Sequence, residues 1–308
     1  MPLFCSNKNP KITNMKVAIY GSRHQADHVG EIAKLVVDLI ENGDSIVIHR
    51  KLYDYLVANV GELFVRATSS VMVTAETGFS ADVALSIGGD GTFLRTAQWV
   101  ADSEIPIIGV NTGRLGFLAP FTIKEAADAV ITHRLANYKI VDRSLLRVDI
   151  SCADLDIWPY AINEVAILKK DTASMISIDA RIDRVPLADY LCDGLIVSTP
   201  TGSTGYNLSV GGPIMQPQSP SFILSPVAAH SLTMRPLVID DSSLLTLNVS
   251  SRTPSFRISL DGRSVNLPCG TDIYISRANF VVKTVCCPGH NFFLTLRNKL
   301  LWGASAMD

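Results

Sequence analysis

The chain has 308 residues, of which 47% are hydrophobic and 18% are charged, a balance typical of a globular protein that excludes wholesale disorder. The 27 Lys and Arg residues nearly match the 29 Asp and Glu residues, so no basic surface is expected for nucleic acid or anionic lipid. No apolar run approaches the roughly 18–20 residues that a membrane-spanning helix needs. The six cysteines include no Cys-x-x-Cys pair, which favours reduced thiols in a cytoplasmic protein over disulfides or a metal site.

The first half of the chain alternates short apolar runs with stretches of helical spacing. The apolar runs predict strands at Lys16–Tyr20, Ser45–His49, Val83–Ile87 and Pro106–Val110. The stretches of helical spacing predict helices at residues 32–40, Thr92–Val100 and Ile123–Leu135. Strands and helices that alternate in this way indicate an α/β domain, with a mostly parallel sheet and helices on both faces.

From about Tyr138 the sequence changes to short β-rich runs. These runs predict strands at Leu145–Ile150, Asn163–Leu168, Ile176–Ile182, Leu244–Val249 and Phe256–Leu260. Asp261-Gly262, which follows the last of them, is a strong hairpin signal. Phe292–Trp302 returns to helical spacing and is expected to pack back on the first domain. We therefore predict an α/β domain over residues 15–143 plus 280–308 and a β-sandwich-like domain over residues 144–279.

A glycine-rich turn, Gly88-Gly-Asp-Gly-Thr92, lies between a predicted strand and a predicted helix. Its glycines let the backbone approach a phosphate closely, and the helix N-terminus offers free N–H groups and a partial positive charge. We predict that Thr92 caps this helix. Asp90 fits two chemical roles, because it could accept the proton of an attacking hydroxyl or act through a divalent ion on the phosphates. The alternative is an ordinary tight turn in which Asp90 is only a cap.

A second glycine-rich loop, Ser198-Thr-Pro-Thr-Gly-Ser-Thr-Gly-Tyr206, follows Asp193-Gly194 and a short apolar run. Such a loop can hydrogen-bond phosphate and ribose oxygens through its hydroxyl groups and place Tyr206 against a flat ring. The loop continues with Asn207, Leu208 and Ser209. Taken without further information, the loop is about as consistent with a hydroxyl-rich surface segment as with a ligand site.

Three further segments accompany the two loops: Asn111-Thr-Gly-Arg-Leu-Gly-Phe-Leu118, Asn163-Glu164 and Ser225-Pro-Val-Ala-Ala-His-Ser-Leu-Thr-Met-Arg-Pro236. In order and spacing, the chain from Met15 onward resembles the NAD kinases, which use ATP to phosphorylate the adenosine 2′-hydroxyl of NAD and so control the balance of NAD and NADP. The first loop alone is shared with diacylglycerol-type lipid kinases and 6-phosphofructokinases. The second loop decides among them, because it matches the NAD kinase pattern through Pro213.

The resemblance implies that Asp90 takes the proton of the 2′-hydroxyl as this oxygen attacks the donor. It implies a site for NAD and ATP formed by Asp90, Gly91, Arg95, Asn163, Glu164, Asp193, Thr204, Gly205, Tyr206, Asn207, Leu208, Ser209 and Ala228. A divalent cation, expected to be Mg²⁺, would neutralise the donor phosphates, and no residue is assigned as its ligand. The resemblance also implies a homo-oligomer, a dimer or tetramer, in which residues near Ala228 approach the neighbouring subunit's ligand.

Three residues depart from the family pattern. Gly205 stands where Ala is usual, Leu191 stands where bacterial relatives often carry Arg, and Arg263 stands where Gln often follows the hairpin Asp. The last two leave the phosphate and ribose contacts near these positions open. Two alternative functions also remain. A lipid kinase would share the first loop, but the near-neutral charge and the second loop speak against it. A non-catalytic NAD sensor would lose the base, whereas Asp90 is present.

Overall fold

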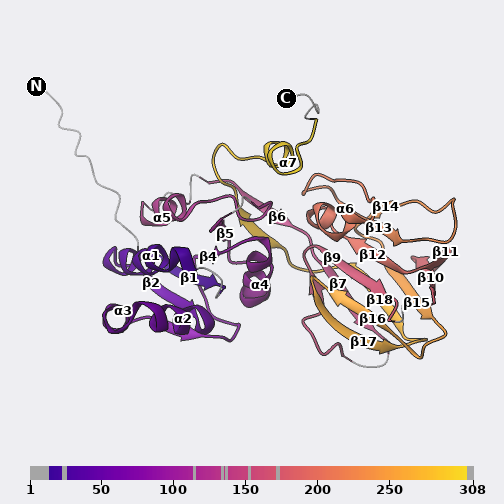
Figure 1. The fold of residues 1–308 in the computed structure, drawn as a ribbon, viewed down its shortest axis with the longest axis horizontal. Coiled ribbons are helices and arrows are strands. Elements are labelled where there is room, and N and C mark those ends of the chain that lie inside the picture. The colour runs from indigo at the N-terminus through magenta and orange to yellow at the C-terminus, as the bar shows by residue number, and fades with distance from the viewer. Residues whose placement is uncertain are drawn as a thin grey trace, which may run out of the picture. The chain divides into compact units, whose positions relative to one another are not determined.

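The computed structural model describes residues 14–22, 26–113, 116–132, 135, 138–151, 154–170 and 174–303. The chain divides into two compact units (Figure 1). The first contains the residues up to Ile140 and those from Val285 onward, and the second contains Val141–Thr284. In the described part of the chain, no helix combines the length and the apolar character needed to cross a membrane.

The strands β1 to β5 of the first unit belong to a seven-stranded sheet in the order β3-β2-β1-β4-β5-β19-β6, and the boundaries between the two units fall within β6 and β19. Its strands are β1 (Lys16–Gly21), β2 (Ser45–His49), β3 (Met72–Thr74), β4 (Val83–Ile87), β5 (Ile107–Val110), β6 (Ile140–Arg143) and β19 (Val282–Val285). The pairs among β1 to β5 are all parallel, which confirms the predicted parallel sheet. The chain order reverses between the neighbours β1 and β4, and ligands of open α/β sheets bind at the carboxyl ends of strands at such a point.

Helices cover both faces of this sheet. They are α1 (Val29–Glu41), α2 (Arg50–Val60), α3 (Glu62–Ala67), α4 (Asp90–Val100) and α5 (Ile123–Ile131), and a further helix, α7 (Phe292–Leu300), follows β19 in the chain. One apolar core joins Leu85 and Ile87 of β4 to buried residues of α1, α2, α3 and α5. Ser86, between them on the strand, points to the opposite face, where its hydroxyl accepts a hydrogen bond from Thr96 of α4 at 2.8 Å. The helices α2 and α3 were not predicted, and α5 ends at Ile131 rather than at Leu135.

The second unit consists of two six-stranded sheets whose pairs are antiparallel. The first sheet contains, in spatial order, β11 (Val185–Cys192), β10 (Ile176–Ile182), β15 (Leu245–Ser250), β18 (Asp272–Arg277), β7 (Leu146–Ile150) and β8 (Tyr160–Ala161). The second contains β14 (Leu237–Asp240), β13 (Ser221–Val227), β12 (Gly194–Ser198), β9 (Glu164–Leu168), β16 (Ser255–Leu260) and β17 (Arg263–Pro268). A single core of buried residues draws on both sheets, so the two sheets form a sandwich, as predicted.

The register of the second sheet brings three of the predicted segments to the same end of its strands. Glu164 at the start of β9 pairs with Ser198 at the end of β12, and Val165 pairs with Leu260 at the end of β16. The segment after β12 continues into a 3-10 turn, η4 (Thr201–Thr204), and a short helix, α6 (Tyr206–Ser209). The second glycine-rich loop, the start of β9 and the β16–β17 turn therefore lie together.

Candidate functional site

The first glycine-rich loop connects β4 to α4, as predicted, at the carboxyl end of the parallel sheet. Gly88 has a φ of 146°, a value that favours glycine, and Gly89 is the N-cap of α4 without any side-chain capping bond. The prediction that Thr92 caps the helix is therefore wrong: Thr92 lies inside the first turn and is buried. Its N–H instead donates to the Gly89 carbonyl at 2.8 Å, because the helix has already begun at Asp90.

Asp90 is held by a different loop rather than by its own helix. One carboxylate oxygen accepts the N–H of Leu118 at 2.9 Å, and the other accepts the N–H of Phe117 at 3.1 Å. A Cβ at Gly116 would lie 2.0 Å from an Asp90 oxygen, so the Gly-Phe-Leu sequence of this loop leaves room for the carboxylate. The Lys299 ammonium of α7 contacts Asp90 at 3.3 Å and lies 4.8 Å from the centre of the Phe117 ring.

Arg95 and Gly91 belong to α4, the helix that begins at Asp90. The Arg95 guanidinium contacts the Thr92 hydroxyl at 3.4 Å. Burial raises the pKa of Tyr20 at the end of β1, and the nearby positive charge of Arg95 opposes this rise. A Cβ at Gly91 would meet no atom within 4 Å, so the space beside the first turn of α4 is open. This end of the sheet thus presents a helix N-terminus, a cation and a carboxylate.

Most hydroxyl groups of the second loop bond the protein itself. The Thr199 hydroxyl donates to the Ile162 carbonyl and accepts the Gly202 N–H at 3.1 Å, and the Ser203 hydroxyl donates to the Pro200 carbonyl at 2.7 Å. A Cβ at Gly202 would lie 2.1 Å from the Asn163 carbonyl oxygen. The buried half of the loop is therefore a scaffold packed against the Asn163-Glu164 segment.

Asn207 is part of the same scaffold, although it was predicted to bind the nucleotide. Its amide group donates to the carbonyls of Ser203 and Pro213 at 3.2 and 3.1 Å, and its oxygen accepts the Ser225 hydroxyl at 2.7 Å. The more accessible predicted residues are Thr204, Gly205, Leu208 and Ser209, with Tyr206 38% exposed. For Asn207, binding through its side chain stays a prediction, since this group already has three protein partners.

Glu164 has the most unusual surroundings among the predicted site residues. Its Oε2 atom is buried and has no hydrogen-bond partner among the described residues. Burial, followed by the nearby charge of Asp261, raises the pKa of Glu164 to about 7, and the Tyr206 N–H opposes this rise. A buried polar atom without a partner costs about 1–3 kcal/mol, so a ligand that supplied a partner would bind with that much advantage.

Asp193 and Ala228 lie at the other end of β12. Asp193 immediately precedes the strand, and its carboxylate forms an ion pair with Lys169 at 2.6 Å. Its N–H donates at 2.9 Å to the carbonyl of Val227, the residue before Ala228. Ser198 lies five positions after Asp193 along extended backbone, which corresponds to roughly 16 Å. The predicted residues of the second unit thus form two groups, one at each end of β12.

Two residues that contact predicted site residues were not assigned a role from the sequence. Lys299 contacts Asp90 from a helix 209 positions away, and no local pattern indicates such a contact. Asp261 was recognised only as a turn residue, but its carboxylate binds the backbone of Asn163 and Glu164. The Asp-Gly pair predicted a turn at this position but did not indicate this contact.

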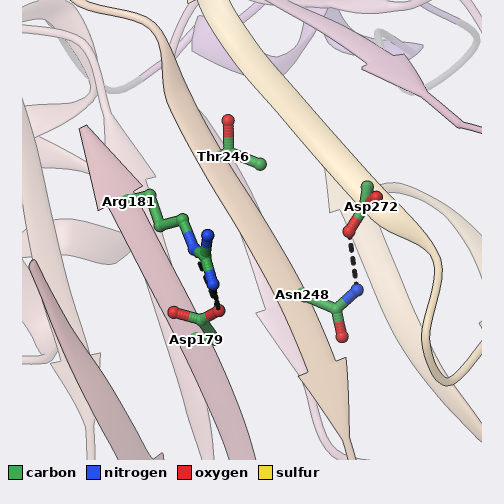
Figure 2. A pocket seen from close by; sticks show the side chains of 5 residues that line it. All are labelled: Asp179, Arg181, Thr246, Asn248 and Asp272. Atoms are coloured by element: carbon green, nitrogen blue, oxygen red, sulfur yellow. Dashed lines mark hydrogen bonds and ion pairs between the residues drawn. The ribbon is translucent and has the colours of Figure 1, made fainter. Parts of the chain in front are cut away.

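A polar hollow on the first sheet of the second unit contains none of the predicted site residues (Figure 2). It is lined by Asp179, Arg181, Thr246, Asn248 and Asp272. Its charged and amide groups pair with one another: Arg181 bonds Asp179 at 2.9 Å, and Asn248 donates to Asp272 at 2.6 Å. Within the described residues, no group of three or more His, Cys, Asp or Glu side chains is arranged to hold a metal ion.

Two family models match the chain. Residues 35–137 match the ATP-NAD kinase N-terminal domain, and residues 162–286 match the ATP-NAD kinase C-terminal domain. Among named relatives, the NAD kinase of Bacteroides fragilis is 43% identical over 292 residues, covering 95% of this chain and 99% of the relative. The NAD kinase of Porphyromonas gingivalis is also 43% identical, over 94% of this chain and 99% of the relative.

Solved structures show the same fold. Yeast NADH kinase complexed with NADH superimposes with a TM-score of 0.81 at 22% identity, over 96% of this chain and 90% of the other. An NAD kinase from Archaeoglobus fulgidus in complex with ATP has a TM-score of 0.67 at 26% identity, over 92% of this chain and 99% of the other. These matches do not favour the lipid kinase alternative. With both halves matched and the relatives covered almost completely, the chain belongs to the NAD kinase family and is an ATP-dependent kinase of NAD.

Proposed function

We propose that Asp90 is the general base of the phosphoryl transfer. The bond between the adenosine 2′-oxygen of NAD and the terminal phosphorus of ATP forms, while the bond from that phosphorus to the ADP oxygen breaks. The 2′-hydroxyl proton goes to an Asp90 carboxylate oxygen. The observation that carries this proposal is a carboxylate at the N-terminus of α4, supported by two backbone N–H groups and with 31% of its side chain exposed.

The geometry of Asp90 leaves it able to accept a proton. The amides of Phe117 and Leu118 and the Lys299 ammonium occupy three acceptor positions, whereas an ionised carboxylate has about four. The two amides fix the orientation of the group, so a substrate hydroxyl meets a carboxylate that is already in place. General-base help of this kind contributes about 10²–10⁴-fold to the rate. Positioning and charge stabilisation supply the remainder.

The donor phosphates are proposed to lie at the N-terminus of α4. Its first N–H groups are without a side-chain cap, and the space beside Gly91 is open. Arg95 adds a positive charge one turn into the helix. These are the features that bind phosphate at helix N-termini, and Lys299 adds a second cation beside Asp90.

The divalent cation, taken as Mg²⁺, is proposed to be held by Asp90 and the donor phosphates together. The donor set fits this ion, because Mg²⁺ usually keeps several waters and binds through one or two carboxylates plus substrate phosphates. Asp90 is partly exposed, and the described residues contain no cage of acidic side chains that would suit a larger ion. When bound, the ion neutralises charge on the phosphates.

NAD is proposed to bind along β12 of the second unit. Asn163, Glu164 and the segment Thr204–Ser209 form one group of contacts, in which the unpartnered Glu164 oxygen accepts a hydroxyl or amino hydrogen of the ligand. Asp193 and Ala228 form the second group at the other end of the strand. The two groups lie roughly 16 Å apart along the strand.

Three further properties are proposed from the family resemblance. The two functional domains are residues 15–143 plus 280–308 and residues 144–279, and the protein acts in the cytoplasm. It is a dimer or tetramer, in which the neighbourhood of Ala228 approaches the ligand of a neighbouring subunit. Light scattering of the purified protein, with and without NAD, measures the oligomeric state, and a monomer under both conditions would contradict that part.

The proposed reaction is tested with purified protein, Mg-ATP and NAD. We expect NADP, detected with an NADP-specific dehydrogenase, to form in proportion to ADP and to disappear when the metal is chelated. A diacylglycerol in detergent micelles serves as the control acceptor. Phosphorylation of the lipid, with no NADP from several donors and metals, would contradict the proposal.

A further inference from the structure

The β16–β17 turn fixes the backbone that carries Asn163 and Glu164. Asp261 and Gly262 occupy the turn with φ values of 48° and 82°, the conformation that an Asp-Gly hairpin favours. This turn points the Asp261 carboxylate inward, with 3% of the side chain exposed. The carboxylate accepts the N–H groups of Ile162, Asn163 and Glu164 at 2.8, 2.9 and 3.1 Å. The Asp261 N–H in turn donates to the Glu164 carbonyl at 3.1 Å.

Arg263, at the start of β17, holds the other side of the same segment. Its two terminal nitrogens donate to the carbonyls of Trp158 and Tyr160 at 2.9 and 2.6 Å. Its guanidinium carbon lies 5.1 Å from the centre of the Trp158 ring. The same group lies 3.9 Å from the Asp261 carboxylate. The segment 158–164 is thus attached to the hairpin at five backbone positions, two through Arg263 and three through Asp261.

Charge in this buried region depends on Arg263. Burial raises the pKa of Asp261, whereas its backbone hydrogen bonds and the Arg263 charge lower it. The charge of Asp261 in turn raises the pKa of Glu164. Arg263 forms an ion pair with Asp261, the carboxylate whose charge acts on Glu164. Without its charge, the negative charge of Asp261 would act on Glu164 uncompensated, and the buried Glu164 carboxyl would be harder to ionise.

We propose that Arg263 is a positioning residue for NAD recognition, which acts through Asp261 and the 158–164 backbone to set the geometry and charge of Glu164. The inference rests on the proposed binding of NAD by Asn163 and Glu164. It also accounts for a departure of this chain from its family pattern, because the Gln often found at this position carries neither the charge nor the fork of donors that reaches two carbonyls.

The test compares Arg263→Gln, Arg263→Lys and a control, Arg257→Gln, on the exposed face of the neighbouring strand β16. KM is measured separately for NAD and for ATP over a range of pH, and calorimetry measures NAD binding without ATP. For Arg263→Gln we expect the KM for NAD to rise about tenfold, the KM for ATP to stay within about twofold, and the pH at which NAD affinity changes to move upward. Arg257→Gln should match the wild type.

Arg263→Lys separates charge from geometry and covers the case in which the Gln variant does not fold. Lysine keeps the positive charge but not the planar fork, so the pH profile should stay near that of the wild type while NAD affinity remains reduced. An equal rise in KM for both substrates, or a lower Tm with unchanged NAD affinity and pH profile, would overturn the inference. Failure of the proposed function would be seen in a different way, because the wild-type protein itself would then make no NADP.

Discussion

The two carboxyl groups proposed to meet the substrates are prepared in opposite ways. In the first unit, Asp90 is partly exposed, accepts two backbone N–H groups and contacts Lys299. In the second unit, Glu164 is buried, and one of its oxygens has no partner. Asp90 is therefore satisfied before any substrate binds, whereas the proposed ligand would supply the partner that Glu164 lacks. This difference suits a group that moves a proton in one case and a group that recognises a ligand in the other.

The supports of the two groups differ as well. Asp90 rests on backbone amides of a loop whose Gly116 cannot accept a Cβ without collision. The backbone N–H of Glu164 donates to the carboxylate of Asp261, and the charge of this carboxylate raises the pKa of the Glu164 side chain. A change near Asp90 should therefore show in turnover, and a change near Glu164 should show in affinity and in pH dependence.

The largest effect is expected from Asp90→Asn. The amide cannot accept the hydroxyl proton, so kcat should fall by about two or more orders of magnitude while NAD affinity stays within a few-fold. Steady-state kinetics and NAD calorimetry measure the two quantities, with Asp102→Asn, an exposed residue of the same unit, as the control. Near-normal turnover would reduce Asp90 to a residue that only holds the loop of Phe117 and Leu118.

A smaller but still large effect is expected from Gly116→Ala. The new Cβ would lie 2.0 Å from the Asp90 carboxylate and displace it, so kcat should fall about tenfold or more. Gly113→Ala in the same loop is the matched control, because a Cβ there meets no atom within 4 Å. If both variants keep wild-type kcat, the position of the Asp90 carboxylate does not limit turnover.

Changes in the second unit should affect NAD more than ATP. Tyr206 is 38% exposed and available for stacking, which contributes on the order of 0.5–1.5 kcal/mol. Tyr206→Ala should therefore raise the KM for NAD several-fold, and Asp193→Ala should act in the same direction by removing a charged acceptor. Calorimetry of NAD without ATP measures both. Unchanged NAD affinity in both variants would mean that this loop serves the donor.

The smallest effect concerns stability and pH. An ordinary glutamic acid titrates near 4.5, but burial and Asp261 raise the pKa of Glu164 to about 7. The folded protein then holds a proton that the unfolded chain releases, so this stabilisation is full below about pH 4.5 and is lost as the pH rises through about 7. Glu164→Gln cannot ionise and should escape this loss.

Thermal unfolding measures the difference. The variant should gain a few degrees in Tm relative to the wild type between about pH 5 and about pH 8, since 1 kcal/mol corresponds to about 2–4 °C in a domain of this size. Glu41→Gln, at an exposed position of α1, is the control and should show no such gain. A constant difference across this range would contradict the raised pKa of Glu164.

Local signals in the sequence predicted the fold class and part of its elements. Strands such as Val83–Ile87 and the Asp261-Gly262 turn follow from short apolar runs and turn residues, and the structure contains both. The helices α2 and α3 were missed because they bury few side chains, Leu52 and Leu56 in α2 and Phe64 in α3, so the apolar spacing is weak. Thr92 was misread because a glycine can serve as an N-cap without a side chain.

The candidate site was predicted as a set of residues but not as a set of contacts. Contacts such as Asp90 with Leu118, or Asp261 with Asn163, join positions 28 and 98 apart in the sequence. No periodicity within a segment reports which distant backbone amide a carboxylate will meet. The sequence also did not show that the Asn207 side chain bonds the protein itself. An Asn residue looks the same in a sequence whether its amide group binds the protein or a ligand.

The interrupted first unit has a consequence for synthesis of the protein. The residues from Val285 onward belong to the first unit, while Val141–Thr284 form the second as one continuous stretch. On the ribosome, the second unit therefore emerges whole before the residues of the first unit from Val285 onward. The ammonium group that contacts Asp90 belongs to Lys299 and emerges later still. A nascent chain that ends at Thr284 would thus contain all of the second unit and would lack every residue of the first unit from Val285 onward.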